Sequence, residues 1–365
     1  MITSRRTRFA LTATALATGI GASLALGGVQ HQNADITLKF GYVTGAAHPY
    51  GQAMKQFKAN VEAASGGRVE IVLQAVYAGG DDIQLFNDVR GGGMQGGAVS
   101  SAVWPNFGVK AFEPLQFPFV LDSYKFEERI INGSSGVAKR MLTSASNKSG
   151  LKVLGIFEGG MRQLVTKGGP VNTLADLKGK KLRAVQAGPL QANMRALGIV
   201  PTPLAVGEVP TALTSGVVDG AEANSALVNT FKWDQAGANH ITLINWFPFP
   251  AVVAMNKAAF DGLPADIQTI ITAEATKLPT FSIQSVVDTD ANKVAVPGIL
   301  CARGVKYHKI APAERAKMVA ASKGVIANLT KKDPEVKAIY NTIARLKSKY
   351  PFADSDTPAD PACIE

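Results

Sequence analysis

The chain has 365 residues, of which 46% are hydrophobic and 18% are charged, so it has enough apolar surface to fold and is not intrinsically disordered. Its length allows two domains with separate cores. The formal net charge of +10 favours anionic partners, but the basic pairs Lys180-Lys181 and Lys331-Lys332 stand alone, without the basic stripe and interleaved aromatic residues that nucleic-acid binding requires.

The first predicted element is an export signal at residues 1–34. Three arginines among the first eight residues precede an acid-free stretch from Phe9 to about Leu26 that is rich in Ala, Leu, Gly and Thr, which is the order of regions in a secretory signal. A permanent membrane anchor is the alternative, but the stretch is short and diluted by Gly and Thr. Without these three arginines the net charge of +10 becomes +7. We therefore expect a basic protein in the periplasm.

The mature chain begins with a predicted βαβ unit. Residues 36–43 alternate as in a strand, Ala53, Phe57 and Val61 recur at helical spacing, and residues 68–76 predict a second strand. Two strands joined through a helix pair in parallel with a right-handed crossover. The chain therefore starts as an α/β fold.

A glycine-rich run follows the next predicted helix, residues 81–90. The run Gly91-Gly92-Gly93-Met94-Gln95-Gly96 formally fits the G-x-G-x-x-G dinucleotide fingerprint. That fingerprint must follow a strand and open a helix, whereas this run follows a helix. We expect a turn of low steric bulk beside a strand or a ligand. Residues 114–122, with two prolines, predict a non-helical connection packed against the core.

The stretch from Gly179 to Asn224 repeats strand, helix and glycine-bounded turn after two short predicted strands at residues 152–157 and 162–166. Arg183 alternates with its apolar neighbours along a short strand, so its side chain points away from theirs. Because α/β sheets bind ligands at their strand ends, this stretch predicts capture of a small anion.

The C-terminal third predicts one strand and several helices. Residues 243–255 are dense in apolar and aromatic groups, as expected for a strand that returns through a buried hinge. Residues 264–296 predict a helical region that Pro279 kinks or divides. Further helices are expected at residues 312–328 and 334–349.

The two cysteines, Cys301 and Cys363, leave two possibilities open. In an oxidising compartment they form a disulfide that ties the tail to the body of the protein. Otherwise they are two unpaired thiols, one buried and one in a loose terminus.

No group of residues predicts catalysis. The four histidines are scattered without the i, i+4 spacing of a helical metal pair, and neither H-E-x-x-H nor G-x-S-x-G occurs. The carboxylate pairs Asp81-Asp82 and Asp288 with Asp290 are expected to face solvent. We therefore expect neither an enzyme nor a bound metal or cofactor.

Several motifs in a shared order resemble the extracytoplasmic solute-binding proteins of tripartite ATP-independent periplasmic (TRAP) transporters, the dicarboxylate-binding type. The resemblance covers nearly the whole mature chain. Its motifs are Gly159-Gly160-Met161-Arg162, Leu177 to Arg183, Glu208 to Leu213 and Gly216 to Glu222.

The resemblance implies an α/β, two-lobed periplasmic-binding-protein fold, in which hinge strands and a long helix that spans both lobes join the two halves. Lobe I is expected at residues 35–157 and about 244–298. Lobe II is expected at residues 158–243 and part of 299–330. Residues 331–365 are left for a C-terminal helix and tail.

The resemblance also implies roles for two arginines. Arg183 forms the main salt bridge to a substrate carboxylate, and Arg162 is a second contact. A guanidinium group can do this because its planar fork holds a carboxylate bidentately and keeps its charge near neutral pH. The candidate ligand-binding residues are Arg183, Arg162, Gln186, Asn224, Glu222, Phe40 and Trp104.

Alternatives stay open for several of these residues. Gln186 and Asn224 either contact the ligand or satisfy backbone groups at strand ends. Phe40 and Trp104 either line the cleft or belong to the core. Ala223 stands where many family members have Asn, so the amide is displaced by one position and the identity of the ligand is open.

The implied function is capture of a small organic acid and its delivery to the membrane permease subunits of a TRAP transporter, with no part for nucleic acid. The receptor of an ATP-driven (ABC) importer, a periplasmic sensor and an exported hydrolase are the alternatives. Whether the ligand has one carboxylate or two stays open.

Overall fold

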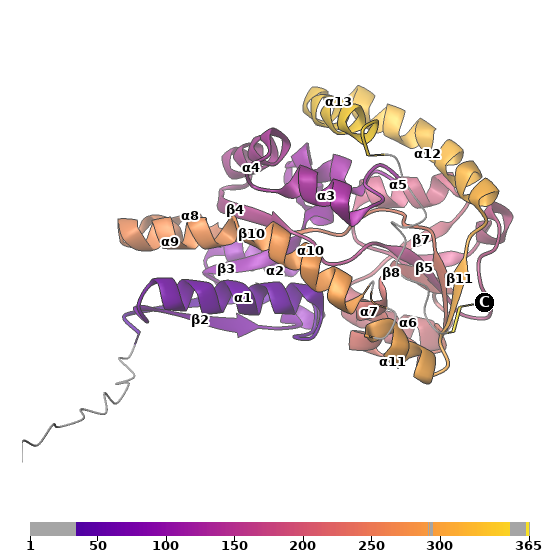
Figure 1. Ribbon diagram of the computed structural model, residues 1–365, viewed down its shortest axis with the longest axis horizontal. Helices are drawn as coiled ribbons and strands as arrows, with labels where there is room; N and C mark the ends of the chain where they lie inside the picture. Colours follow the sequence, from indigo (N-terminus) through magenta and orange to yellow (C-terminus); the bar gives the residue numbers. More distant parts are fainter. Residues whose placement is uncertain (1–33, 291, 293–294, 351–362, 365) are drawn as a thin grey trace, which may run out of the picture. The chain divides into compact units, whose positions relative to one another are not determined.

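The computed structural model describes residues 34–290, 292, 295–350 and 363–364 of the chain, which Figure 1 follows from indigo to yellow. Residues 1–33 of the expected export signal lie outside the described residues. Among the helices of the described ranges, none has the length and apolarity needed to cross a membrane.

The first sheet has five strands and mixed direction. The strand of residues 36–42 pairs in parallel with its neighbours on both sides, and the strand of residues 251–256 is antiparallel to its two neighbours. This confirms the predicted parallel βαβ start. In spatial order the strands are β2 (Val69–Gln74), β1 (Ile36–Tyr42), β3 (Gly96–Ser100), β10 (Ala251–Asn256) and β4 (Leu151–Phe157).

Helices pack against this sheet, and together with it they form what we call the first lobe. The helix after β1 buries Ala53, Phe57 and Val61, the three residues at the predicted helical spacing. The lobe also contains the 3₁₀ turns η1 (Tyr77–Gly79), η2 (Ser101–Phe107) and η3 (Lys110–Gln116). Its α-helices are α1 (Pro49–Ala64), α2 (Asp82–Gly91), α3 (Tyr124–Ile131), α4 (Gly136–Ser149), α8 (Lys257–Asp261), α9 (Ala265–Ala275) and α10 (Leu278–Thr289).

Two expectations for this lobe have clear outcomes. Pro279 lies in the first turn of α10, so it divides the helical region as predicted. The non-helical connection expected at residues 114–122 is wrong at its start, because Pro114 lies inside η3. A short 3₁₀ turn tolerates a proline there because it loses only one weak hydrogen bond.

The glycine-rich run closes α2 and opens β3. Gly92 has φ +85° and caps the end of α2. At Gly96 a Cβ atom would overlap with the ring of Phe40, which packs edge-on against Phe57 at 5.7 Å. The run therefore provides the compact turn that was expected, beside a strand.

The second sheet has six strands, and we call this sheet and the helices packed on it the second lobe. Its central strands pair in both directions, with β6 parallel and β5 antiparallel to β8. In spatial order the strands are β11 (Lys306–Lys309), β9 (His240–Leu243), β5 (Gln163–Thr166), β8 (Gly220–Ala223), β6 (Lys181–Ala184) and β7 (Val200–Pro203). The helices and turns are η4 (Leu174–Leu177), α5 (Gly188–Ala196), η5 (Val206–Glu208), α6 (Val209–Thr214), α7 (Ser225–Phe231) and α11 (Val296–Ala302).

Two chain segments connect the sheets side by side. The single strand expected at residues 243–255 is wrong, because β9 ends at Leu243 in the second sheet and β10 begins at Ala251 in the first. Proline at two positions in between removes backbone donors, so the chain leaves one ladder before it joins the other. The two connecting segments, residues 158–162 and 244–250, run antiparallel to each other. The Arg162 N–H donates to the Phe247 carbonyl at 2.8 Å, and the Trp246 N–H donates to the Arg162 carbonyl at 3.0 Å.

Helices also connect the two lobes. α10 packs on α1 and β4, and Asp290 at its end accepts a hydrogen bond from the Ala226 N–H of α7 at 2.7 Å. α12 (Pro312–Lys332) packs on α5 and continues into α13 (Pro334–Lys347), which packs on η3. Figure 1 shows α12 and α13 along the upper edge of the molecule, opposite α1.

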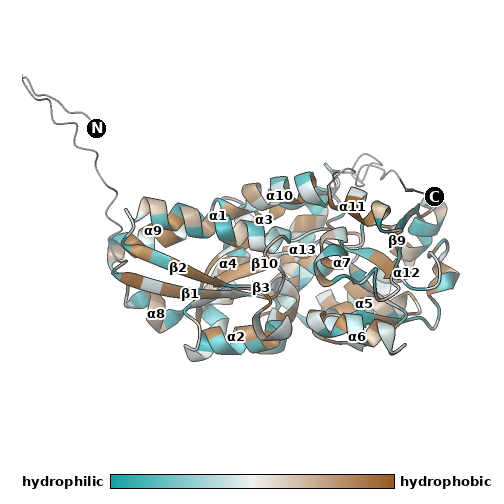
Figure 2. Cartoon of the chain, turned by 90° about the horizontal axis from the view of Figure 1, so that it is seen from below, coloured by the Kyte–Doolittle hydropathy of each residue, from teal (hydrophilic) through white to brown (hydrophobic). Residues whose placement is uncertain are grey.

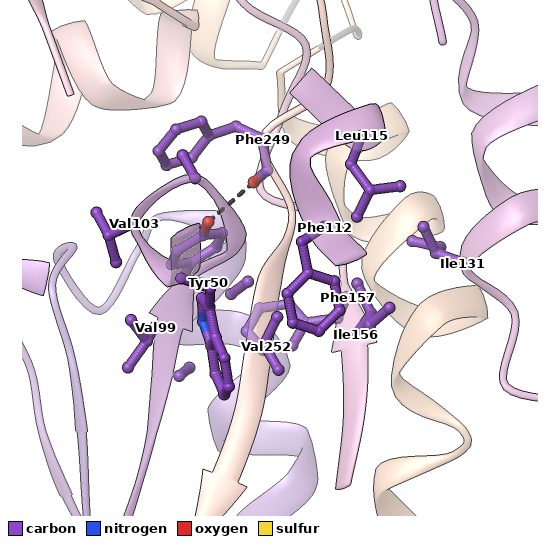
Figure 3. Close-up of a cluster of buried hydrophobic side chains, with 14 of the residues drawn as sticks. Tyr50, Val99, Val103, Phe112, Leu115, Ile131, Ile156, Phe157, Phe249 and Val252 are labelled. Carbon is purple, nitrogen blue, oxygen red and sulfur yellow. Dashed lines mark hydrogen bonds between the residues drawn. The ribbon is translucent and has the colours of Figure 1, made fainter. Parts of the chain in front are cut away.

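The core of the first lobe reaches the connecting segments. Tyr50 is fully buried, its ring lies 5.2 Å from that of Phe157, and its hydroxyl donates to the Phe249 carbonyl at 2.9 Å (Figure 3). Gly159 makes room for this ring, because a Cβ atom there would overlap with Tyr50. Figure 2 shows apolar residues along β1 and polar residues on the outer face of α2, as a core beneath a solvated surface requires.

Cys301 and Cys363 form a disulfide, with 5.6 Å between their Cα atoms. Of the two possibilities left by the sequence, the cross-link is therefore the one present. The Tyr307 N–H donates to the Cys363 carbonyl at 3.2 Å, so residues 363–364 lie along β11.

Candidate ligand-binding site

Two arginines and one glutamate meet where the second sheet joins the connecting segments. Glu222 on β8 lies between Arg183 of the neighbouring strand β6 and Arg162, which directly precedes β5. One of its carboxylate oxygens, Oε1, is 3.0 Å from Arg183 Nη1, and Oε2 is 3.3 Å from Arg162 Nε. The three residues are 0 to 4% exposed, so water does not screen these charges.

Each arginine has further contacts that fix its direction. The Arg183 Nε–H donates to the Leu204 carbonyl at 3.0 Å. The guanidinium carbon of Arg162 lies 3.6 Å from the centre of the Phe249 ring, a cation–π contact. Both guanidinium groups are therefore held in place before any ligand arrives, which lowers the entropic cost of binding.

Some buried donors have no protein partner. Nη1 of Arg162 and Nε1 of Trp104 lack a hydrogen-bond acceptor among the described residues. A buried polar group left unpaired costs about 1 to 3 kcal/mol. Acceptor oxygens of a ligand would remove that cost.

The structure brings Arg162, Arg183 and Glu222 together, but it gives Glu222 a different contact from the one expected. Its two oxygens face the guanidinium groups, and a negative ligand group would be repelled by it. Glu222 therefore orients the arginines and neutralises one of their two charges.

Asn224 uses both ends of its amide inside the protein. Its Nδ2 donates to the Gly159 carbonyl at 2.7 Å, and its Oδ1 accepts from the Leu227 N–H at 3.0 Å as the N-cap of α7. Gly160, with φ +122°, leaves space for this amide, since a Cβ atom there would overlap with it. Of the two roles left open for Asn224, these contacts favour the structural one.

The remaining candidates lie at different depths. The main-chain carbonyl of Gln186 accepts from Asn106 Nδ2 at 2.6 Å, and its side chain is half-buried. Phe40 lies in the core of the first lobe, where its ring packs against Phe57. Trp104 packs between Phe86 and Phe112, at 5.0 and 5.3 Å, so only its indole N–H is left for a ligand.

Two residues of the first lobe act on the site although sequence reasoning missed them. Burial raises the pKa of Asp82 to about 7. The hydrogen bond from the Ser100 N–H and the positive charges of Arg183 and Arg162 lower this pKa, but by less than burial raises it. Burial and the charge of Arg162 lower the pKa of His48 to about 3, so His48 is neutral.

The expectation that both carboxylate pairs face solvent is wrong for Asp290, which is buried at the end of α10, while Asp288 is exposed. Asp81 and Asp82 are half-buried, and Asp82 Oδ1 accepts from the Ser100 N–H at 2.7 Å. Asp81 caps α2 by accepting from the Ile83 and Gln84 N–H groups. A helix cap needs only one acid. The presence of a second acid, Asp82, was therefore the feature of the sequence that could have indicated another role.

The rims of the two lobes touch. Asn106 of the first lobe donates to Gln186 of the second, and Asn193 Nδ2 donates to the Gln116 carbonyl at 3.2 Å. At Gly207 of the second lobe, a Cβ atom would overlap with the carbonyl of Gly79 of the first lobe. The lobes are thus in a closed arrangement around the arginines.

The arrangement can hold an anion and has the charge to do so. Within residues 34–290, 292, 295–350 and 363–364, no group of three His, Cys, Asp or Glu side chains is placed to hold a metal ion. The surplus positive charge of the arginine pair is therefore the chemical feature that the site offers.

A family model and two relatives of this chain agree on the family to which it is similar. The family model described as bacterial extracellular solute-binding protein, family 7, matches residues 40–333. A solute-binding protein of Verminephrobacter eiseniae is 32% identical over 298 residues, which are 82% of this chain and 86% of that protein. The C4-dicarboxylate-binding periplasmic protein DctP of Rhodobacter capsulatus is 27% identical over 281 residues, 77% of this chain and 82% of that protein.

A solved structure has the same fold. The sugar acid binding protein DctPAm of Advenella mimigardefordensis, in complex with galactonate, aligns with a TM-score of 0.77 at 24% identity. The alignment covers 86% of this chain and 98% of that one. The two-lobed α/β architecture expected from the sequence is therefore confirmed.

Proposed function

This chain belongs to the bacterial extracellular solute-binding protein family 7, and from that premise we propose that it captures a small organic acid and delivers it to the membrane subunits of a TRAP transporter. The observation that carries the proposal is the buried pair Arg162 and Arg183, whose two guanidinium groups both form an ion pair with the one carboxylate of Glu222. Family membership favours a TRAP transporter over an ATP-driven importer.

The charge balance explains why the ligand is an acid. A buried guanidinium without a counter-ion is strongly disfavoured, and a carboxylate supplies both the charge and two acceptor oxygens. Arg183 is the main anchor and Arg162 the second one, with the indole N–H of Trp104 and the side chain of Gln186 as further donors. The relatives agree in chemistry, since one is a C4-dicarboxylate-binding protein and another holds galactonate.

Binding without chemical conversion is the role that this site supports. Closure excludes water and brings both lobes to the ligand, and a ligand that contacts both lobes stabilises the closed arrangement. The bound acid leaves unchanged when the lobes open. Export through residues 1–34 would place the protein in the periplasm, where the disulfide of Cys301 and Cys363 forms readily.

A thermal-shift screen across organic acids tests the function. A ligand that binds only the native state raises the melting temperature by mass action. We expect carboxylic acids to raise it, and their amides and neutral analogues to leave it unchanged. Calorimetry with the best acid then gives the dissociation constant. A library in which no acid shifts the melting temperature, or a product formed from the bound acid, would contradict the proposal.

A further inference from the structure

The net positive charge of this protein comes from four helices, α3, α4, α12 and α13. Their sequences contain 13 Lys and Arg residues and four Glu residues, a net charge of +9. The mature chain as a whole has +7 once the three arginines of the leader are subtracted from +10, so everything else together has −2. The net positive charge is thus concentrated on these four helices.

A groove lies among three of these helices. α3 contacts α4, and α13 contacts both α4 and α12, and Figure 1 shows the four helices along the same upper side. The space between α3, α4 and α13 is a cavity of about 690 Å³, which we call the basic groove. Lys125, Arg129 and Arg140 line it, together with the single acid Glu128. Its apolar lining consists of Val137, Ile339, Leu346 and Tyr350.

The cations of the groove are not used inside the protein. Lys125, Arg129 and Arg140 are exposed, and so is the neighbouring Lys139 of α4. None of them has an ion pair among the described residues, whereas Lys148 at the other end of α4 pairs with Glu335 at 2.6 Å. Unpaired like charges repel one another and lower stability, so this cluster has no structural benefit. A negative partner from outside the chain would give it one.

We propose that the basic groove docks an acidic, partly apolar protein segment that the membrane subunits expose to the periplasm. The inference rests on the proposed function, because it names the surface through which the ligand is delivered. A concave groove with an apolar lining fits a protruding protein segment, whereas a flat bilayer cannot reach that lining. Charge complementarity at the rim of an interface raises the association rate and makes it dependent on salt.

Charge reversal in the groove tests the proposal. The double variant Arg129→Glu/Arg140→Glu is compared with Lys39→Glu/Lys55→Glu, which makes the same charge change on exposed residues of β1 and α1. Calorimetry with the acid found in the thermal-shift screen shows first that both variants bind it as the wild type does. Uptake is then measured in phosphatidylcholine proteoliposomes that contain the cognate membrane subunits.

We expect the uptake rate of the groove variant to fall at least about tenfold at low salt. The variant with charge reversals on β1 and α1 should keep the uptake rate of the wild type. Added salt should slow uptake by the wild type. Equal uptake by all three proteins would overturn the inference, as would equal losses in both variants. A difference that appears only when the vesicles contain phosphatidylglycerol would assign the groove to lipid. A wild-type dimer that only the groove variant loses would assign it to a second copy. No uptake with the wild type would reject the transport function itself.

Discussion

At the scale of single residues, the carboxylate of Glu222 lies between two guanidinium groups and sets the charge that they offer. Alone, Arg162 and Arg183 would repel each other and would be costly to bury. With Glu222 between them, at 3.3 and 3.0 Å, the trio has one surplus positive charge. One carboxylate of a ligand balances that charge.

We expect Arg183→Ala to weaken ligand binding by about 3 to 5 kcal/mol, the cost of leaving a buried charge without its partner. This is about two to three and a half decades in the dissociation constant, which calorimetry measures directly. Arg183→Lys should also bind poorly, because an ammonium group lacks the planar fork. The control is Arg195→Ala on the exposed face of α5, which should bind normally. Unchanged affinity in the Arg183 variants would contradict the anchor role.

A second prediction concerns two fully buried acids, Glu127 on α3 and Glu158 in the connecting segment. Burial, and then the charge of Glu158, raise the pKa of Glu127 well above its usual value. Glu158 Oε1 already accepts from the N–H groups of Gly160 and Phe249, at 2.6 and 3.1 Å. Both Glu127 oxygens and Glu158 Oε2 lack a hydrogen-bond partner among the described residues, so we expect Glu127 to hold a proton that it shares with Glu158.

Holding that proton in the folded state makes stability depend on pH. The unfolded state loses the proton above a pKa of about 4.3, while the folded state keeps it, so the free energy of unfolding falls as pH rises toward the folded pKa. Glu127→Gln keeps a donor without the titration. We expect it to raise stability in urea denaturation at pH 7 and to flatten the pH dependence. Glu128→Gln on the same helix should do neither. A Glu127→Gln protein with the wild-type slope would reject the shared proton.

At the scale of elements, the first strand, helix and strand were predictable because their burial follows simple periods. Ala53, Phe57 and Val61 recur at helical spacing and are all buried. The strand at residues 243–255 could not be predicted correctly, because an unbroken apolar run does not say to which sheet each half belongs. The roles of Arg183 and Arg162 were implied by the family resemblance and stay predictions. The contact of Asp82 with Ser100 depends on the packing of α2 on β3, which the sequence does not show.

The disulfide gives a prediction about β11 and the end of the chain. Cys301 and Cys363 are 62 residues apart, and a cross-link of this kind stabilises a protein by about 2 to 4 kcal/mol, mainly by restricting the unfolded chain. We expect the double variant Cys301→Ser/Cys363→Ser to melt several degrees lower but to bind its ligand normally, since neither residue contacts the arginines. Thiol titration of the unfolded, non-reduced wild type should find no free thiol. Two titratable thiols would contradict the cross-link.

At the scale of the whole molecule, the lobes meet along a rim of small residues. Gly79 and Gly80 of the first lobe lie against Val206 and Gly207 of the second. The connecting segments hold the sheets by backbone hydrogen bonds close to Arg162, so we expect motion of one lobe relative to the other to be centred near the proposed ligand anchor. Closure and binding are therefore coupled through the same residues.

Gly207→Ala should hinder closure of the lobes without changing folding or any contact with the ligand. The added Cβ atom would overlap with the backbone carbonyl of Gly79, which cannot rotate away as a side chain can, so the lobes must separate. We expect the ligand affinity to fall by about 1 to 3 kcal/mol, or about 5- to 150-fold by calorimetry. The melting temperature of the ligand-free protein should stay the same, because the open arrangement has room for the methyl group. Gly324→Ala, at an open position on α12, should change no affinity. If Gly207→Ala bound the acid as tightly as the wild type, contact between the rims would not be part of the bound state.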